Sequence, residues 1–528
     1  MSGQLPSLPY ADGIRKATQI KFKGYNHNAY AGDGELYDMK NMSSDLYPLL
    51  APRKQRYLYK VLADPNGFYA GDGLYWVDGT EFYADGIKRG TVTNSLKQFT
   101  SLGAYIIILP DLCYYNRLTQ EFGTLAASWT GSVKLQDGTF AGENATANTI
   151  YAAGANWANV FRVGDAVTIS GATVHPENNK TIVIREIDGD YLRFYENSFV
   201  IEKNGDTENL GLTRDIPDVQ YMCENENRLW ACKGDTIYSS KLGDPFNWNV
   251  FDGLSTDSYA VDVGSAGDFT GCCSFLGYPC FFKEEHVYKV YGDRPSNFQV
   301  MGSASMGVEA GSHASLAIAG EVLFYLSRTG VVAYTGGIPQ NIAAPFGTER
   351  YRNAVGGSDG IKYYISMQDM DGAWTLFVYD TRSNMWHKED ALQVVGFGWN
   401  GDLFFLSNTG RLFINGNARS IPENAVKEPP VLSMVEFGDF IEGDPNKKGT
   451  SKLQMRIELD AGATVTVSMQ FDSDGQWRDV TTLTATQKRS FYLPIIPRRS
   501  DHYKLRLMGT GEYCLYSLSR ENYIGSEL

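Results

Sequence analysis

Histidine is scarce in this chain, which has only six in a length of 528 residues. None of the six stands at the HxH or HExxH spacing that brings two imidazoles to one metal ion. The seven cysteines are odd in number, form no CxxC pair and lie mostly inside apolar runs, which predicts buried free thiols rather than a disulfide framework. We therefore expect neither a metal site nor a cofactor.

Long apolar runs are also missing. No stretch of about 18 apolar residues predicts a membrane span, and residues 1–13 lack the charged and apolar regions of a signal peptide. These absences predict a chain that is synthesised in a cytoplasm and has no membrane segment.

Positive charge is in the minority, because 47 Lys and Arg stand against 61 Asp and Glu, for a net charge of −14. A surface that binds nucleic acid needs clustered cations that displace phosphate counterions, so this balance argues against one. The same balance is compatible with enclosing DNA, since an acidic wall repels phosphate and lets a duplex pass without sticking.

The sequence has no recognisable catalytic constellation, neither a GxSxG elbow nor a phosphate-binding Walker A segment. Glycoside hydrolysis needs two facing carboxylates, and 61 acidic residues single out no pair. The turn Asp472–Trp477 has the closely spaced oxygens of a calcium loop but lacks the downstream glutamate of an EF-hand. We predict that the chain is not an enzyme, with a propeller glycosidase as the last-ranked alternative.

Glycine and aromatic residues are abundant, with 55 Gly, 33 Tyr and 27 Phe, as in a turn-rich all-β chain. The stretch Glu224–Phe251 shows the unit that recurs. Apolar Leu229–Ala231 and Ile237–Ser239 flank Gly234, which supplies the positive φ of a tight hairpin turn. A lone hairpin cannot bury its own apolar face, so it needs neighbours of the same kind.

Similar hairpins do recur along the chain, and they predict a propeller. Their centres lie about 34 to 50 residues apart, close to the period of a four-stranded blade, except for one interval of about 123 residues. The centres are Tyr75, Tyr115, Tyr238, Tyr288, Tyr334, Tyr379 and Phe413. We predict an all-β fold with a β-propeller of six to eight blades; the alternative is an unrelated series of hairpins in a large sandwich.

The long interval marks an insertion, and the C-terminal region has its own pattern. Period-2 runs within residues 125–213 predict an inserted small β-barrel, a contact domain rather than a nucleic-acid binder because its loops lack a Lys/Arg cluster. Alternating strands after a proline-containing linker predict a C-terminal β-sandwich over residues 426–528. Residues 1–124 then hold an N-terminal extension and the first blades, and residues 214–425 hold the remaining blades.

The N-terminal part carries a distinctive set of residues: Gly34-Glu35-Leu36, the pair Asn41-Met42 and the P-L-x-x-P-R segment Pro48–Arg53. Together with the hairpin series and the segment GDTIYSSKLGDPFNW at Gly234–Trp248, they resemble the tail tubular protein B or nozzle family of short-tailed bacteriophages and the related packaged-DNA stabilisation proteins.

This resemblance covers roughly residues 14–115 and 215–420. It implies β-propellers that assemble as a ring, a homohexamer, below the portal and adaptor of a virion tail. The protein would be made in the host bacterial cytoplasm, meet other tail proteins, and let genomic DNA pass without sequence-specific binding. The alternative function is a host-surface glycan-binding or receptor-binding propeller, with the C-terminal sandwich as its binding module.

Two groups of residues have predicted roles, one in blade packing and one in contact with a partner. Four aromatic residues are expected to pack the blades, so that mutation impairs folding and assembly before any binding: Trp230, Tyr238, Trp248 and Trp386. Three residues of the sandwich are candidates for partner contact: Trp477, Arg498 and Arg499. The indole could stack on a sugar, and the two arginines could meet an acidic partner, although a core aromatic and a solvated ion pair are the simpler interpretations.

Overall fold

The computed structural model describes residues 14–524, except for residues 30, 33, 145, 203–204, 442–446, 485–486 and 497. The described chain is built of β-strands, and its helices are five short 3-10 turns, none of which could cross a bilayer. These turns are η1 (Trp157–Asn159), η2 (Pro176–Asn178), η3 (Pro295–Asn297), η4 (His313–Ser315) and η5 (Ala344–Phe346).

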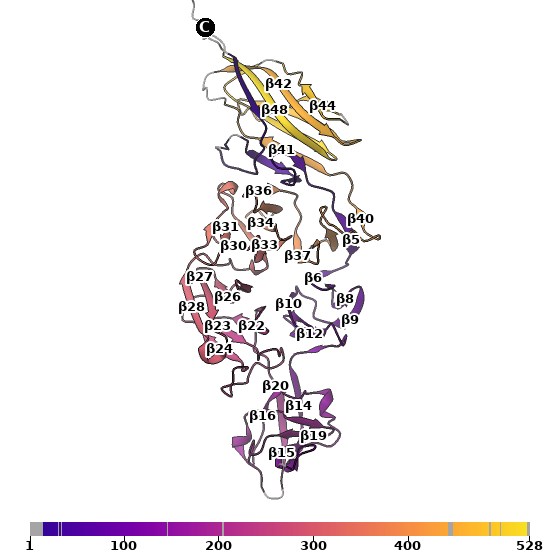
Figure 1. The fold of residues 1–528 in the computed structure, drawn as a ribbon, viewed down its shortest axis with the longest axis vertical. Helices are drawn as coiled ribbons and strands as arrows, with labels where there is room; N and C mark the ends of the chain where they lie inside the picture. The colour runs from indigo at the N-terminus through magenta and orange to yellow at the C-terminus, as the bar shows by residue number, and fades with distance from the viewer. Residues whose placement is uncertain are drawn as a thin grey trace, which may run out of the picture. The chain divides into compact units, whose positions relative to one another are not determined.

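The chain forms two compact units (Figure 1). The first contains the residues up to Pro65, Ala70–Gly73 and the residues from Ala314 onward, and the second contains Asn66–Tyr69 and Leu74–His313. Seven antiparallel sheets of the blade type are distributed between them, so the fold is all-β with a β-propeller.

Four blades belong to the second unit, and each is a meander of consecutive strands. The first two blades are β6 (Pro65–Ala70), β7 (Leu74–Asp78), β8 (Glu81–Ala84), β9 (Ile87–Thr91), and β10 (Gln98–Leu102), β11 (Tyr105–Leu109), β12 (Cys113–Asn116), β13 (Phe122–Thr124). The next two are β21 (Tyr221–Asn225), β22 (Arg228–Lys233), β23 (Thr236–Ser239), β24 (Tyr259–Asp262), and β25 (Gly271–Phe275), β26 (Tyr278–Lys283), β27 (His286–Tyr291), β28 (Gln299–Ala304).

Neighbouring blades of this unit bury their faces against one another. Tyr75 and Phe82 of one blade share an apolar cluster with Ile106 and Ile108 of the next. The first strands β10, β21 and β25 lie side by side. This face-to-face packing gives each hairpin the apolar partner that it cannot supply itself.

Three blades belong to the first unit. Two are β29 (Ala317–Ala319), β30 (Val322–Ser327), β31 (Gly330–Tyr334), β32 (Gln340–Asn341), and β33 (Tyr351–Ser358), β34 (Lys362–Asp369), β35 (Trp374–Asp380), β36 (Met385–Lys388). The third combines β37 (Val394–Trp399), β38 (Leu403–Ser407) and β39 (Arg411–Ile414) with β5 (Tyr57–Val61) and β40 (Val426–Lys427). An early strand therefore completes the sheet of a late blade, with Leu412 opposite Lys60.

The hairpin centres identified from the sequence each fall in a different blade, six of them on the third strand. Tyr75 is the exception, because it lies on β7, the second strand of its sheet. The residue at the equivalent place on β8 is Tyr83. The turns are as expected for two-residue hairpins: Gly234 has φ 57°, and Glu226 and Asn227 both have positive φ, as a type I′ turn requires.

The insertion lies within the second unit and is the expected small β-barrel. Its seven strands pair in the order β17-β16-β20-β14-β15-β19-β18, and their buried residues form one apolar cluster. The strands are β14 (Ala127–Thr139), β15 (Thr146–Tyr151), β16 (Ala166–Ser170), β17 (Thr181–Val183), β18 (Glu186–Asp188), β19 (Tyr191–Phe194) and β20 (Asp206–Arg214).

The C-terminal β-sandwich consists of two five-stranded sheets in the first unit. One contains β1 (Ile14–Gln19), β48 (Tyr513–Ile524), β42 (Lys448–Leu459), β45 (Arg489–Tyr492) and β46 (Arg499–Ser500). The other contains β2 (Leu36–Lys40), β41 (Leu432–Phe437), β47 (Tyr503–Thr510), β43 (Thr464–Phe471) and β44 (Arg478–Leu483). The alternating residues Met455, Ile457 and Leu459 are buried between them, as expected.

The sandwich differs from the expected range 426–528 in two respects. Strands β1 and β2 come from the N-terminal part, which the sequence indicated to be an extension and first blades. Strand β40 belongs instead to a blade, so the sandwich resumes at Leu432. Local periodicity shows which face of a strand is buried but does not identify the partner strand, and these pairings join residues hundreds of positions apart.

Candidate functional site

The N-terminal segment that follows β2 is anchored by Asn41. Its backbone has φ 54°, a left-handed conformation that asparagine tolerates well. Its side-chain Nδ2 donates to the Leu432 carbonyl at 2.9 Å, and its Oδ1 accepts from Nε of Arg53 at 2.8 Å. Just beyond it, the short strands β3 (Met42–Ser43) and β4 (Ala51–Pro52) pair with each other, which sends Arg53 back toward the blades.

Arg53 and Arg56 meet three carboxylates in a buried group that we call the charged clamp: Arg53, Arg56, Glu389, Asp390 and Glu428. Arg53 binds Glu428 through two parallel hydrogen bonds, Nη1–Oε2 at 2.8 Å and Nη2–Oε1 at 3.0 Å. Arg56 reaches Asp390 at 2.7 Å and Glu389 at 2.5 Å. Both arginine side chains are nearly inaccessible, whereas Asp390 and Glu428 are partly exposed, and the clamp joins the N-terminal segment to two blades.

Electrostatics favour the ionised state of two carboxylates of the clamp, Asp390 and Glu428. Burial opposes ionisation of Asp390, but the charge of Arg56 more than compensates, so the pKa of Asp390 lies below its usual value. Burial likewise opposes ionisation of Glu428, and hydrogen bonding to Arg53 lowers the pKa of Glu428 overall. Asp390 and Glu428 are therefore held as stable anions, the opposite of what a general acid needs at neutral pH.

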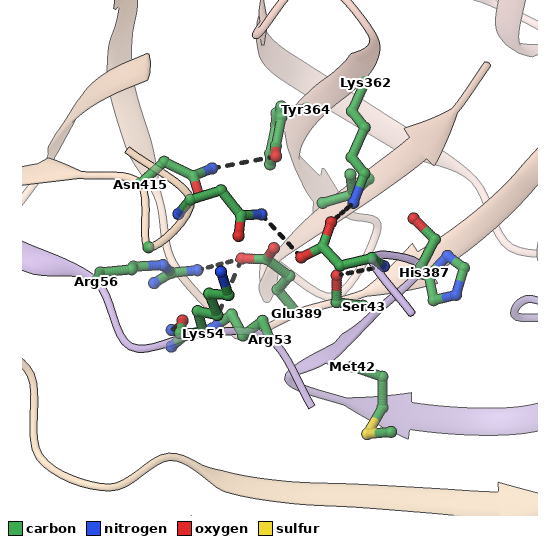
Figure 2. A pocket seen from close by; sticks show the side chains of 15 residues that line it. Met42, Ser43, Arg53, Lys54, Arg56, Lys362, Tyr364, His387, Glu389 and Asn415 are labelled. Atoms are coloured by element: carbon green, nitrogen blue, oxygen red, sulfur yellow. Dashed lines mark hydrogen bonds and ion pairs between the residues drawn. The ribbon is translucent and has the colours of Figure 1, made fainter. Parts of the chain in front are cut away.

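A second set of polar contacts lines a small cavity beside the clamp (Figure 2). Lys362 pairs with Asp45, whose other carboxylate oxygen accepts from Nδ2 of Asn417 at 2.8 Å. Nδ2 of Asn415 donates to the Tyr364 hydroxyl at 3.1 Å. The cavity volume is about 10 Å³, which is room for about one water molecule.

His387 lies at the edge of this cavity and is 5% exposed. Burial, reinforced by the charge of Lys362, lowers the pKa of His387 to about 4, so the ring is neutral at physiological pH. Its Nδ1 has no hydrogen-bond partner among the described residues. A buried neutral imidazole could act as a base only if a substrate reached it, and a one-water cavity admits none.

A second joint fastens the insertion to its blade within the second unit. The ring of Phe246 packs edge-on against Tyr105 and Tyr114, with centroids 5.3 and 5.1 Å away. The guanidinium groups of Arg162 and Arg214, both from the insertion, lie 3.8 and 5.0 Å from the centre of the same ring. One aromatic side chain thus serves both partners, through ring packing and cation–π contacts.

Asn247 completes this joint, which we call the insertion anchor: Arg162, Asp165, Arg214, Phe246 and Asn247. Its Oδ1 accepts from the amide of Ala166 at 2.8 Å, and its Nδ2 donates to the Gly164 carbonyl at 3.3 Å. Arg214 pairs with Asp165, whose pKa is raised because burial disfavours its charge. These buried polar contacts are directional, so they set the orientation of the insertion on the blade as well as holding it there.

An open cleft of about 680 Å³ lies next to the insertion anchor, lined by Tyr114, Glu121, Arg162 and Arg214 among others. Its charged groups are already engaged: Arg162 lies 3.3 Å from Glu121, and Arg214 pairs with Asp165. Because these charged side chains already pair with one another, few polar groups of the cleft are available to orient a ligand.

The four aromatic residues expected to pack the blades lie at three kinds of place. Trp230 and Trp386 are buried among other rings, with Trp230 5.1 Å from Phe298 and Trp386 4.8 Å from Phe346. Trp248 is buried in the loop after β23 and donates to the Pro245 carbonyl at 2.9 Å. Tyr238 is only partly buried, at the edge of the cluster between two blades.

The three candidate partner-contact residues do not form one surface contact. Trp477 has the guanidinium of Arg506 4.3 Å from its ring centre, so one indole face is occupied. Arg498 lies over Phe471, and exposed Arg499 donates to the Lys447 carbonyl at 3.2 Å. Asp501, two positions after Arg499 in the sequence, pairs with His502 at 2.6 Å.

The sequence pointed to some of the residues of the charged clamp and of the insertion anchor, but not to all of them. It singled out Asn41, Arg53 and the Gly234–Trp248 segment as distinctive, but it identified none of the carboxylates of the clamp. Glu389 and Asp390 follow a blade strand and Glu428 follows β40, places at which acidic residues are common and carry no signal. Only the fold brings them to the arginines.

No protein-family model matches the chain, and no curated protein matches it. Raptor from Chaetomium thermophilum aligns at 10% identity and a TM-score of 0.32 over 70% of this chain, which spans about 30% of that protein. The β-propeller domain of the Trilobed protease from Pyrococcus furiosus aligns at 11% identity and a TM-score of 0.26, over 62% of this chain and 96% of that one. An exo-beta-1,3-galactanase from Phanerochaete chrysosporium aligns at 8% identity and a TM-score of 0.22, over 56% of this chain and 95% of that one. The chain is similar to each of these proteins only at a level too low to indicate its activity.

Proposed function

We propose that the chain is a structural component of a short-tailed bacteriophage tail, a nozzle-like ring that forms or closes the DNA conduit below the portal and adaptor. One observation carries the proposal: the residues that resemble the nozzle family coincide with the two internal joints. Arg53 belongs to the charged clamp and is hydrogen-bonded to Asn41, and Phe246 and Asn247 belong to the insertion anchor. Motifs used to hold elements together are expected in a protein whose task is to keep a shape.

The chemistry of the clamp supports a structural role rather than catalysis. Its carboxylates are paired with arginines, the pKa values of Asp390 and Glu428 are lowered, and the adjoining cavity has room for about one water. A glycosidase would instead need two carboxyl groups facing an open groove, one of them with a raised pKa. The proposal therefore includes no enzymatic activity.

The proposed assembly is a homohexamer that contacts the adaptor and other tail proteins in the virion. The net charge of −14 fits a conduit wall, because phosphate is repelled from it and DNA can slide. A closed ring requires a head-to-tail contact that repeats around one axis, so self-association is an obligatory property.

Negative-stain microscopy of the full chain, alone and with particles that carry the adaptor, tests the proposal. We expect six-fold rings with a central hole wide enough for a duplex, or added density at one particle vertex. Monomers that persist at high concentration and in the presence of adaptor would overturn it. Monomers that bind host cells would favour the receptor-binding alternative, which a glycan array probed with the full chain would examine; a 426–528 fragment is unsuitable because it lacks β1 and β2.

A further inference from the structure

Strand β20 of the insertion has two buried carboxylates on one face. Asp206 and Glu208 stand two residues apart on the same face of the strand and are 6% and 7% exposed. Their cross-strand neighbours on β14 are Leu135 and Val133, both buried and apolar. Two buried carboxylates in such surroundings are costly unless positive charge balances them.

An imidazole lies close to one of them. Among the described residues, no lysine or arginine lies within ion-pair distance of Asp206 or Glu208, whereas Nε2 of His175 lies 3.7 Å from Oδ2 of Asp206. His175, Asp206 and Glu202 each offer one ligand atom, and these three atoms lie within 4.8 Å of one another. Imidazole nitrogen with carboxylate oxygens is a ligand set that suits zinc.

Glu208 provides a second observation, independent of the cluster. Its Oε1 accepts three hydrogen bonds, from the amides of Thr173 and Val174 at 2.7 and 2.6 Å and from the Thr173 hydroxyl at 3.1 Å. Its Oε2 is buried and has no hydrogen-bond partner in the part of the chain that the structure describes. Burial opposes ionisation of Glu208, but hydrogen bonds from Val174 and Thr173, together with the charge of His175, lower its pKa overall. Nε2 of His175 is likewise buried and lacks a hydrogen bond to any described residue.

The sandwich contains a comparable group that is internally satisfied. Asp501 lies 2.6 Å from Nδ1 of His502, and Oδ1 of Asp472 accepts from the Asp501 amide at 2.9 Å. The remaining imidazole nitrogen, Nε2 of His502, lies 2.7 Å from the Ser473 hydroxyl. This group has used both of its imidazole nitrogens, and it serves as a control for the first.

We propose that His175, Asp206 and Glu208, with Glu202 at the solvent-facing rim, bind a divalent cation of the zinc class. The ion would take Nε2 of His175, the Asp206 carboxylate and the free Oε2 of Glu208. It would balance the buried negative charge and tie the Thr173–Val174 loop to the first residues of β20. The role is structural stabilisation of the insertion, independent of any ring assembly.

Isothermal titration of the metal-stripped full chain with Zn²⁺ tests the site, with Ca²⁺ and Mg²⁺ as comparison ions. We expect one tight Zn²⁺ equivalent that is weakened at least about tenfold in His175→Ala and in Glu208→Gln. The matched control His502→Ala should bind as the parent does. Loss of the equivalent in His502→Ala alone, preference for Ca²⁺, or no Zn²⁺ binding by the parent would each overturn the proposal.

Two further measurements distinguish the proposed site from two alternatives. In one alternative the metal binds cysteine thiols, and in the other Glu208 only accepts hydrogen bonds and does not bind metal. Co²⁺ bound at the site should show visible absorption without the thiolate charge-transfer band, and a strong thiolate band would place the ion on cysteine instead. Glu208→Gln keeps the acceptor for Thr173 and Val174 while removing the charge, so it should raise the melting temperature of the metal-free chain and abolish the rise caused by Zn²⁺. A lower metal-free melting temperature combined with an undiminished Zn²⁺ response would contradict the proposal.

Discussion

Arg53 and Glu428 are separated by 375 positions in the sequence and are joined by two parallel hydrogen bonds. The pair closes the charged clamp, since Arg53 also bonds Asn41 and lies 3.5 Å from Asp390. The Arg53 side chain therefore links the N-terminal segment to two blades: to Glu428, which follows β40, and to Asp390, which follows β36.

Replacing Arg53 by alanine should destabilise the first unit by about 3 kcal/mol, because Glu428 and Asp390 would lose a buried partner. Chemical denaturation followed by tryptophan fluorescence measures the change. Arg53→Lys should recover only part of the loss, since an ammonium cannot form the two-bond contact.

The exposed pair Lys88–Glu81, with an N–O distance of 2.5 Å, provides the control. Lys88→Ala should change the unfolding free energy by less than about 1 kcal/mol. Equal effects of the two substitutions would contradict the importance assigned to burial in the clamp.

Asn247→Ala should loosen the insertion on its blade, because the buried Ala166 amide and Gly164 carbonyl lose their partners. We expect faster hydrogen exchange in a peptide covering residues 160–170, with a local cost of about 1–3 kcal/mol. Asn249→Ala, which removes a long 3.4 Å contact to the Asp215 carbonyl, should leave that peptide unchanged.

Acid should weaken the first unit before the carboxylates titrate. The pKa of His387 falls from 6.5 to about 4 on folding, chiefly through burial, so between these values the unfolded chain binds a proton that the folded chain does not. Stability should therefore decline as pH falls from about 6.5 to 4, by about 3 kcal/mol in full.

His387→Gln should flatten this part of the stability curve, as measured by urea denaturation at intervals of pH. His286→Gln, a change at a half-buried blade position, is the comparison. A decline of the same size in the His387 variant would assign the acid sensitivity to other groups, such as His313, whose pKa burial also lowers to about 4.

Trp386→Ala should cost about 3–5 kcal/mol, because the indole is 1% exposed and packs against Phe346, Phe377 and Tyr379. Trp386→Phe keeps most of the ring packing but removes the donor to the Ile342 carbonyl, so we expect a cost of about 1 kcal/mol. Thermal unfolding ranks the two variants, and the reverse order would indicate that the hydrogen bond matters more than the packing.

The parts of the fold that depend on neighbouring residues could be predicted from the sequence. The β22–β23 hairpin was identified because Gly234 and the flanking apolar runs lie within a few residues of one another. Tyr75 marks the β6–β7 hairpin, whereas the other centres mark the hairpin of the second and third strands, since a four-stranded meander contains three similar hairpins and period-2 patterns do not rank them.

The two joints could not be predicted, for a physical reason. Phe246 was expected to accompany a blade, and it does, but its contacts with Arg162 and Arg214 depend on a domain inserted between two blades. Likewise, nothing local to Arg53 indicates that Glu428 is its partner. Such pairs are specified by topology, and without the fold each charged residue resembles any solvated one.

The pairing of β1 with β48 and of β5 with β39 has a consequence for biosynthesis. Both N-terminal strands leave the ribosome with their hydrogen-bonding edges open, because their partners β39 and β48 are translated only several hundred residues later. An unpaired edge is a template for association with other chains, so the nascent protein has to be protected for most of its elongation time. A chain interrupted before Tyr513 would keep β1 unsatisfied permanently, which makes premature termination a route to aggregation and not merely to a shorter product.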